Sequence, residues 1–295
     1  MYVRLLTQED FKNLDAYLEP HTGFTFFIRS NAHKGGLDYR GQPYQSEVFG
    51  AFKDGDLVGV LSHAWLGHMQ VFMTDKSAAV ALASTWREHH DGKPRKLSEI
   101  LGPMDDVLAI RQALGIDEHD LRAGGRDEYL FTLDISTMNV PPQLHEPEYI
   151  VRRATIEDGA TLIPWRYEFY MEALGDPGGE DARRRAEANI NGMIHEKNVY
   201  VLEYRGQIVS FCGCGGYLPD WRGIGPVWTP VSFRGKGYAR IVTAGALNIV
   251  RAGGVRHAVL FSENPQAIRL YEALGFQKIG RWKLDFLINP ERSFS

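Results

Sequence analysis

The fold is decided by residues 225–240, which read GPVWTPVSFRGKGYAR. An apolar strand ends here in a loop with two glycines, Gly235 and Gly237, and two cations, Arg234 and Lys236, before a helix begins. The first turn of a helix leaves backbone N–H groups unpaired and carries a partial positive charge, and both features attract an anion. Glycine lets the backbone approach a phosphate closely. The segment therefore predicts a strand–loop–helix unit whose loop binds a pyrophosphate.

Other glycine-containing motifs fit this chain less well. Neither the Walker spacing G-x-x-x-x-G-K-[ST] nor the dinucleotide fingerprint G-x-G-x-x-G occurs in residues 225–240. A surface turn with solvated cations is the alternative interpretation of residues 234–239. The glycines within 213–216 and 252–254 are expected to be structural.

Internal similarity indicates two copies of one structural plan. Three pairs of segments match in the same order along the chain: 2–10 (YVRLLTQED) with 150–158 (IVRRATIED), 48–58 (VFGAFKDGDLV) with 199–209 (VYVLEYRGQIV), and 108–116 (LAIRQALGI) with 268–276 (IRLYEALGF). The second pair predicts hairpins and the third predicts helices that end at a glycine. A duplicated domain explains this order better than chance does.

The length of 295 residues also suits two domains, at roughly 150 residues each. We predict a first domain over 1–137, a linker over 138–148 and a second domain over 149–295, because a proline-containing stretch without apolar periodicity separates the copies.

The second copy is predicted to mix helices and strands. Strands are expected at 149–154, 198–204, 207–217, 224–231, 255–261 and 276–288, and helices at 160–174, 180–196, 237–251 and 265–274. An antiparallel hairpin comes first and one right-handed parallel β–α–β crossover comes after it. The fold class is therefore α/β with mixed α+β character, in which each mostly antiparallel sheet is flanked by helices, and not a doubly wound sheet.

Composition excludes several classes of protein. Charged residues make up 24% and the formal net charge is −4, so nucleic acid is not an expected partner. Two cysteines cannot form a disulfide scaffold, and Cys212 and Cys214 are expected to be packing residues. No apolar stretch resembles a signal peptide or approaches the ~20 residues of a membrane span. We expect a cytoplasmic protein without a membrane partner, and no metal site.

Two motifs together resemble the GNAT acyltransferase superfamily. Residues 234–239 (RGKGYA) fit its [QR]-x-x-G-x-[GA] signature, and residues 264–276 (NPQAIRLYEALGF) resemble its N-x-x-A-x-x-x-Y-E-x-x-G-F segment. The resemblance covers about 149–288 and is much weaker in the first copy. It implies two tandem GNAT-like domains and transfer of an acetyl group from acetyl-coenzyme A, the cosubstrate, to an amine.

The resemblance also implies roles for particular residues. The backbone N–H groups of Gly235, Lys236, Gly237, Tyr238 and Ala239 would hold the pyrophosphate, with the charge of Arg234 beside them. The main chain near Thr229 and Val231 would run beside the pantetheine arm, where the family's sheet opens. Pro226 and Pro230 agree, because a proline removes a hydrogen-bond donor from a strand.

Three further side chains are candidates for the site. Asn264 is an ideal helix cap before Pro265, and in the family such an amide contacts coenzyme A. Tyr271 is either a core tyrosine or the general acid that protonates the departing thiolate, since a tyrosine with a pKa of about 10 is protonated at neutral pH. The family often places a base on the strand before the loop, but residues 224–231 are uncharged. Glu172 is our first candidate base, and Glu168 and Asp220 are the next.

The first copy is expected to lack the cofactor site. Residues 73–81 (MTDKSAAVA) contain no glycine, and Arg111 and Met104 stand at the positions of Tyr271 and Asn264. We predict an N-acetyltransferase that acts by direct attack of a small-molecule or peptide amine, as a monomer or homodimer. The alternatives are a non-catalytic sensor of coenzyme A or acetyl-coenzyme A, and a tandem acetyltransferase that resembles mycothiol synthase or modifies an antibiotic.

Overall fold

The computed structural model describes residues 1–91, 95–122 and 125–290. The chain divides into two compact units of mixed α/β structure. Unit 1 comprises Met1–Phe131, Phe261–Glu263 and the residues from Lys278 on; unit 2 comprises Thr132–Leu260 and Asn264–Gln277. The division at 137 and 149 stays a prediction, because these units are interleaved along the chain. The end of that prediction, 291–295, lies outside the described residues.

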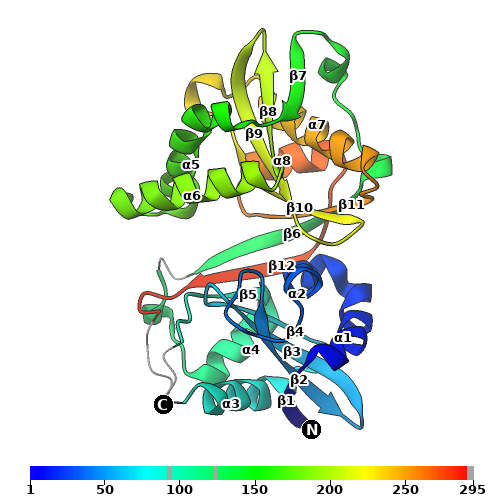
Figure 1. Ribbon diagram of the computed structural model, residues 1–295, viewed down its shortest axis with the longest axis vertical. Coiled ribbons are helices and arrows are strands. Elements are labelled where there is room, and N and C mark those ends of the chain that lie inside the picture. Colours follow the sequence, from blue (N-terminus) through cyan, green and yellow to red (C-terminus); the bar gives the residue numbers. More distant parts are fainter. Residues whose placement is uncertain (92–94, 123–124, 291–295) are drawn as a thin grey trace. The chain divides into compact units, whose positions relative to one another are not determined.

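Unit 1 is built on one sheet with helices on both faces (Figure 1). Its elements are β1 (Tyr2–Leu5), α1 (Phe11–Leu18), α2 (Thr22–Gly35), β2 (Ser46–Lys53), β3 (Asp56–Ala64), β4 (His68–Met73), α3 (Ala78–His90), β5 (Glu99–Pro103), α4 (Met104–Leu114), β6 (Arg126–Asp134) and β12 (Gln277–Phe286). Strands follow the order β1-β2-β3-β4-β5-β12-β6, with β4 and β5 parallel and β12 antiparallel to β5. The last strand of the chain therefore completes the sheet of unit 1.

Alternating side chains of these strands make two separate cores in unit 1. Phe49 and Leu61 pack with α3 and α4, whereas their chain neighbours Val48 and Val60 pack with α1 and α2. Successive side chains of a strand point to opposite faces, so a sheet covered on both sides needs apolar residues at nearly every position.

Unit 2 follows the same plan. Its elements are β7 (Tyr149–Arg153), α5 (Gly159–Leu174), α6 (Glu180–His195), β8 (Val199–Tyr204), β9 (Gln207–Gly215), β10 (Trp221–Trp228), α7 (Tyr238–Ala252), β11 (His257–Ser262) and α8 (Pro265–Leu274). The strand order is β11-β10-β9-β8-β7, in which β10 and β11 alone are parallel among these described strands. The elements predicted for the second copy are found, with two corrections. β10 begins and ends three residues earlier than predicted, because Trp221 already pairs with His257 and a 3-10 helix occupies Val231–Phe233. The strand predicted at 276–288 is β12, which pairs with β5 of unit 1.

Both units begin with the same ion-paired turn. In unit 1, the Asp10 carboxylate accepts hydrogen bonds from Arg4, at 2.6 and 2.7 Å, and from the backbone N–H of Thr7 at 2.9 Å. In unit 2, Asp158 accepts the same bonds from Arg152 and Thr155. This shared detail supports the duplication predicted from the matched segments.

The sheet of unit 2 lies between α5 and α7. On β9, the ring of Phe211 stacks on Trp165 of α5. Gly245 lets α7 approach β7 closely, because a Cβ there would overlap the side chain of Val151. This packing holds the middle of α7, the helix that follows the loop, against the sheet.

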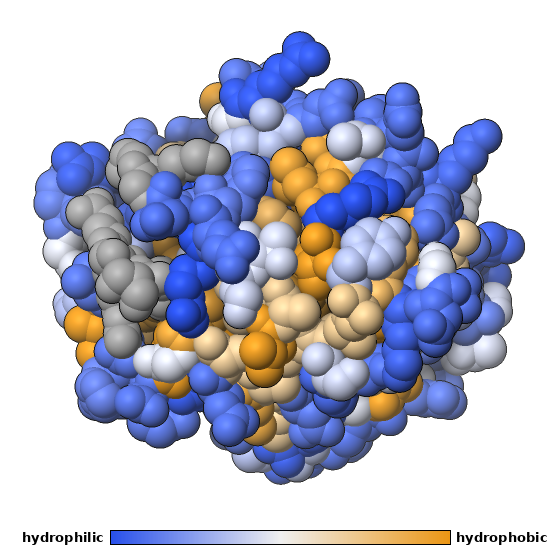
Figure 2. Space-filling model, turned by 90° about the horizontal axis from the view of Figure 1, so that it is seen from below, coloured by the Kyte–Doolittle hydropathy of each residue, from blue (hydrophilic) through white to orange (hydrophobic). Residues whose placement is uncertain are grey.

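Hydrophilic side chains cover most of the molecular face shown in Figure 2, and apolar side chains gather near its middle. The mean hydropathy of the chain is −0.28. None of the described helices is both long and apolar enough to cross a membrane.

Candidate active site

The site is built where β10 separates from β11. Parallel pairing joins Trp221–Gly223 to residues 257–259, and within the described residues, which include both strands, no further register is found. From Ile224 to Trp228, β10 pairs with β9 alone, with a bulge between Ile224 and Val227. The proline at 226 lies in that bulge, as expected for a strand with one edge not paired to protein. The sheet therefore opens beside the end of β10.

The bulge also explains a glycine that could be mistaken for a nucleotide motif. Gly213 lies on β9 opposite the bulge, and a Cβ there would overlap the carbonyl oxygen of Gly225. The glycine is thus required by close backbone approach, in agreement with the structural role expected for residues 213–216.

Two glycines shape the loop between β10 and α7. Gly235 has φ +80° and Gly237 has φ +77°, which are left-handed conformations that favour glycine. A Cβ at either position would meet no other atom within 4 Å, so the backbone there is open. The first N–H of α7 with a backbone partner belongs to Arg240, which donates to Gly237 O at 3.0 Å. The N–H groups of residues 235–239 precede it, as an anion site requires.

Arg234 is fixed before this loop by several contacts. Its Nε donates to Thr229 O at 2.9 Å, and its guanidinium lies 4.8 Å from the ring centre of Trp228. Its Nη1 and Nη2 donate to the two carboxylate oxygens of Glu172 at 2.8 and 3.0 Å. The structure thus joins the candidate base Glu172 to the candidate anion ligand Arg234.

The other predicted cofactor residues have different surroundings. Thr229 is buried and its hydroxyl lies 2.8 Å from that of Ser210, whereas Val231 is 71% exposed. Tyr238 is buried against Tyr204 and Tyr149, and Lys236 lies over its ring at 6.0 Å. The side chain of Tyr238 therefore anchors the start of α7, and only its backbone faces the loop.

Asn264 and Tyr271 lie on α8. The side-chain oxygen of Asn264 accepts hydrogen bonds from the N–H groups of Gln266 and Ala267, at 2.8 and 3.2 Å. This confirms its role as a helix cap. Tyr271 is buried, and its ring meets Phe276 edge-on at 5.7 Å. Both surroundings agree with the structural roles weighed for these residues and leave the predicted chemical roles open to experiment.

The remaining candidate bases are less well placed. Asp220 precedes the first residue of β10 and pairs with Arg256 at 2.9 Å, so the whole strand, about 26 Å at 3.3 Å per residue, separates it from the loop. Glu168 is exposed on α5. Neither carboxylate is held beside residues 234–237.

The part of the chain that contains this loop matches a known protein family. Residues 161–276 match the model of the acetyltransferase (GNAT) family. This part of the chain is a GNAT acetyltransferase domain. The match includes α5, the loop and α8, so all the predicted site residues lie within it.

Solved structures extend the GNAT fold to the whole chain. A Drosophila protein has a TM-score of 0.66 at 13% identity, covering 98% of this chain and 99% of its own. A GCN5-related N-acetyltransferase from Sphaerobacter thermophilus has a TM-score of 0.58 at 16% identity, covering 99% and 96%. A tandem GNAT protein from the clavulanic acid biosynthesis pathway has a TM-score of 0.56 at 13% identity, covering 96% and 97%. No curated protein matches the sequence. The tandem GNAT fold is therefore confirmed.

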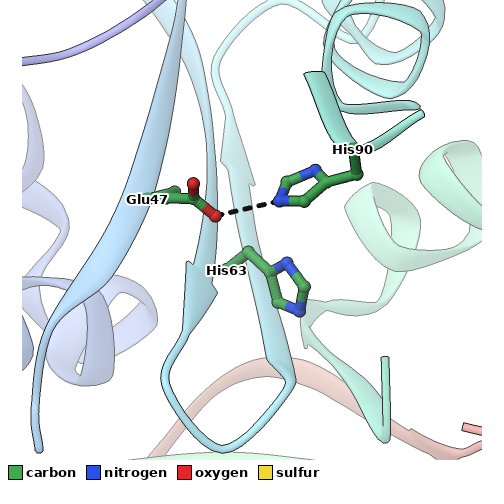
Figure 3. A group of neighbouring side chains, drawn as sticks. All are labelled: Glu47, His63 and His90. Atoms are coloured by element: carbon green, nitrogen blue, oxygen red, sulfur yellow. Dashed lines mark hydrogen bonds and ion pairs between the residues drawn. The ribbon is translucent and has the colours of Figure 1, made fainter. Parts of the chain in front are cut away.

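Outside the GNAT domain, unit 1 brings three potential metal ligands together: Glu47, His63 and His90 (Figure 3). Both ring nitrogens of His63 already bond to protein, because Nε2 lies 3.0 Å from Lys96 O and Nδ1 accepts from the indole N–H of Trp86 at 3.1 Å. We therefore interpret the group as a hydrogen-bonded network, and the expected absence of a metal site stays a prediction.

Glu47 is the anion of this network. Its carboxylate pairs with Arg95 and with His90, whose Nε2 lies 2.9 Å from Oε2. Although burial acts in the opposite direction, the hydrogen bond from His90 and the charge of Arg95 lower the pKa of Glu47 to about 2. The carboxylate is therefore ionised at neutral pH and holds its cations in place.

The two cysteines of the GNAT domain are free and buried. Burial raises the pKa of Cys214 to about 12 and that of Cys212 well above its usual value. Because the thiolate is the reactive form, neither thiol is suited to act as a nucleophile. The expectation that both are packing residues agrees with this.

Sequence reasoning missed the contacts of two aromatic residues beside Arg234. Trp228 lies under the guanidinium of Arg234, and Phe169 of α5 meets Trp228 edge-on at 5.9 Å. The position of Trp228 directly before the loop was the available signal. The contact with Phe169 joins residues distant in sequence, so no local pattern indicates it.

Proposed function

We propose that this protein transfers an acetyl group from acetyl-coenzyme A to a primary amine. The observation that carries the proposal is the loop of two open, left-handed glycines at the start of α7, beside the unpaired edge of β10. A pyrophosphate fits this donor set, because several backbone N–H groups and a helix N-terminus converge there. Acetyl-coenzyme A brings the acetyl thioester on which the amine acts.

The loop, the end of β10 and Tyr271 have separate roles in this proposal. The N–H groups of residues 235–239 bind the pyrophosphate. The main chain from Thr229 to Val231 runs beside the pantetheine arm. Tyr271 donates the proton that the departing thiolate needs.

The reaction forms one bond and breaks one. The amine nitrogen attacks the thioester carbonyl, the new C–N bond replaces the C–S bond, and the amine proton passes to a base or to water. An amine with a pKa near 10.4 is neutral in only about one molecule in 2,500 at pH 7, so this deprotonation is a large part of the barrier. Glu172 remains the first candidate for this role from sequence, and Glu168 and Asp220 are the others.

A panel of amines tests the proposal. Purified protein with acetyl-coenzyme A is expected to release free thiol with at least one small-molecule or peptide amine. The Tyr271→Phe variant should bind acetyl-coenzyme A normally in calorimetry, while kcat falls about 10²- to 10⁴-fold, the usual contribution of an acid or base. Tyr204→Phe is the matched control, since its ring lies in the tyrosine cluster behind the loop. No heat with acetyl-coenzyme A in the folded wild type would refute the proposal.

One observation favours a non-catalytic sensor of coenzyme A as the second candidate. Residues 224–231 carry no carboxylate, and both oxygens of Glu172 are bonded to Arg234. If the wild type binds the thioester tightly and no amine in a broad panel releases thiol, the sensor replaces the enzyme.

The acceptor itself belongs to the same proposal. The solved tandem GNAT protein from the clavulanic acid biosynthesis pathway supports a small-molecule amine as the acceptor, as in a mycothiol-synthase-like or antibiotic-modifying enzyme. We further propose that the protein is a monomer or homodimer in the cytoplasm and that neither nucleic acid nor a membrane is a partner.

A further inference from the structure

The pair formed by Glu172 and Arg234 gives Glu172 a different role from that of a base. Arg234 directly precedes the first glycine of the loop, and Glu172 lies in the last turn of α5. Two parallel hydrogen bonds, at 2.8 and 3.0 Å, join them. A fork of this kind fixes both the distance and the plane of the guanidinium, which a single charge contact does not do.

The same helix also reaches the end of β10. Phe169, one turn before Glu172, meets Trp228 edge-on, and Trp228 lies under the guanidinium of Arg234. The Nε of Arg234 also donates a hydrogen bond to Thr229 O at 2.9 Å, just after the end of β10. The residues on both sides of the 229–234 turn are therefore attached to α5.

The two glycines after this attachment are intrinsically flexible. Gly235 and Gly237 have no side chain, and a Cβ at either position would meet no other atom within 4 Å, so no packed side chain restricts the backbone there. A loop that samples several conformations binds an anion more weakly, in proportion to the fraction of time it spends in the competent one. Fixing Arg234 raises that fraction.

We infer that Glu172 is a positioning residue, which acts through Arg234 to hold the 234–237 loop in the conformation that binds the acyl-thioester carrier. This inference rests on the proposed function for the identity of the ligand. Both carboxylate oxygens accept hydrogen bonds from the guanidinium, so the geometry orients the carboxylate toward Arg234. Glu172 therefore sets affinity for the carrier, and the deprotonation of the amine takes place without it.

The Glu172→Gln variant tests this inference, because the amide keeps the size of the side chain and loses the charge and the fork. We expect Kd for coenzyme A, measured by calorimetry, to rise about three- to tenfold, as is usual for a partly exposed ion pair of good geometry. At saturating acetyl-coenzyme A, kcat and its dependence on pH should not change. Glu187→Gln, an exposed carboxylate on the neighbouring helix α6, is the control and should leave all three quantities unchanged.

A second variant and a ligand-free measurement separate this inference from the proposed function. Arg234→Lys keeps the charge and loses the fork, so it should raise Kd similarly, and the double variant should be no worse than either single one. Without any ligand, amide hydrogen exchange at residues 235–239 should be faster in Glu172→Gln than in the wild type, at equal melting temperature.

Three outcomes decide the matter. If Glu172→Gln lowers kcat and removes its pH dependence at unchanged Kd, Glu172 is the base and the inference is wrong. If exchange and Kd both stay at wild-type values, the pair does not position the loop. If the wild type binds no coenzyme A while exchange still depends on Glu172, the proposed function fails and the positioning role stands.

Discussion

The loops after the fourth strand of each unit differ in whether a buried carboxylate of the chain contacts them. In unit 1, the backbone N–H of Met73, at the end of β4, donates to the Asp106 carboxylate at 2.8 Å, and Lys76 pairs with the other oxygen of this carboxylate. Asp106 is completely buried. In unit 2, the corresponding loop of Gly235 and Gly237 is open. One unit thus fills this position with its own carboxylate, and in the other the proposed function places the pyrophosphate of the ligand there.

The helix after the fifth strand shows the same difference. Arg111 of α4 stands where α8 has Tyr271, and it is buried with hydrogen bonds to Asp285 at 3.0 Å and Glu118 at 2.9 Å. A guanidinium held by two carboxylates serves packing and not proton transfer. Unit 1 therefore has the fold with internal ion pairs at the positions where unit 2 has its candidate site residues.

The largest expected effect tests how much the buried carboxylate of unit 1 stabilises the fold. Asp106→Ala leaves the N–H of Met73 and the ammonium of Lys76 without their buried partner. We expect the free energy of unfolding in urea to fall by about 3 kcal/mol. Asp105→Ala, an exposed acid in the same first turn of α4, is the control and should cost no more than about 0.5 kcal/mol.

The same variant tests whether removal of the Asp106 carboxylate is enough to create a coenzyme A site in unit 1. Asp106→Ala should gain no affinity for coenzyme A in unit 1, because residues 73–81 contain no glycine to bring backbone N–H groups onto a phosphate. If the variant bound a second equivalent of coenzyme A, the carboxylate of Asp106, and not the lack of glycine in the loop, would be what prevents binding in unit 1.

A smaller effect is expected at the open loop of unit 2. Gly237→Ala forces a side chain into a left-handed position and changes the direction of the N–H groups that we propose bind the pyrophosphate. We expect Kd for coenzyme A to rise about 10- to 100-fold, the loss of one or two charge-assisted hydrogen bonds. Gly206→Ala is a matched control, because Gly206 has φ +78° and equally open surroundings in the β8–β9 turn. Equal losses of affinity in the two variants would contradict a binding role for the loop.

Local signals made much of this comparison predictable. The helices and strands of unit 2 follow from apolar periodicity and from glycines at helix ends, and the loop follows from Gly235 and Gly237 at a helix start. The unpaired edge of β10 was indicated by its prolines. The first copy was expected to lack a cofactor loop because its residues at that position include no glycine.

The remaining features depend on contacts between distant residues. Lys283 and its neighbours on β12 pair with β5 in unit 1, although the chain reaches them directly after α8 of unit 2. No local pattern sets the register of such a strand. In the same way, the bond between Glu172 and Arg234 spans 62 residues, so each could be identified as a candidate but not as the other's partner.

The smallest expected effect concerns a buried position that the two units fill differently. The matched hairpins place His63 of β3 where β9 has Cys214, and both side chains are buried. Burial and the nearby charges of Arg95 and His90 lower the pKa of His63 to about 3, although Glu47 acts in the opposite direction. Burial raises the pKa of Cys214 to about 12. Both groups are therefore neutral at pH 7, and only the histidine titrates in acid when the chain unfolds.

Because, of these two groups, only His63 titrates differently in the folded and unfolded states in acid, it makes the free energy of unfolding depend on pH there. Between about pH 6.5 and pH 3, the unfolded chain protonates at His63 and the folded protein does not, so the free energy of unfolding falls as the pH falls through this window. At pH 5.5 the loss from this group is about 1.4 kcal/mol relative to pH 7.5. His63→Asn removes the titrating group. Between pH 7.5 and pH 5.5, the free energy of unfolding in urea should therefore fall by that much less in this variant than in the wild type, whatever the stability of the variant at pH 7.5.

Cys214→Ser, at the matched position of unit 2, is the control. It should show the same dependence of stability on pH as the wild type, because a thiol stays protonated in both the folded and the unfolded state in this pH range. An unchanged slope in His63→Asn would mean that His63 accepts its proton in the folded state, and that the hydrogen bond from Trp86 does not hold the ring neutral.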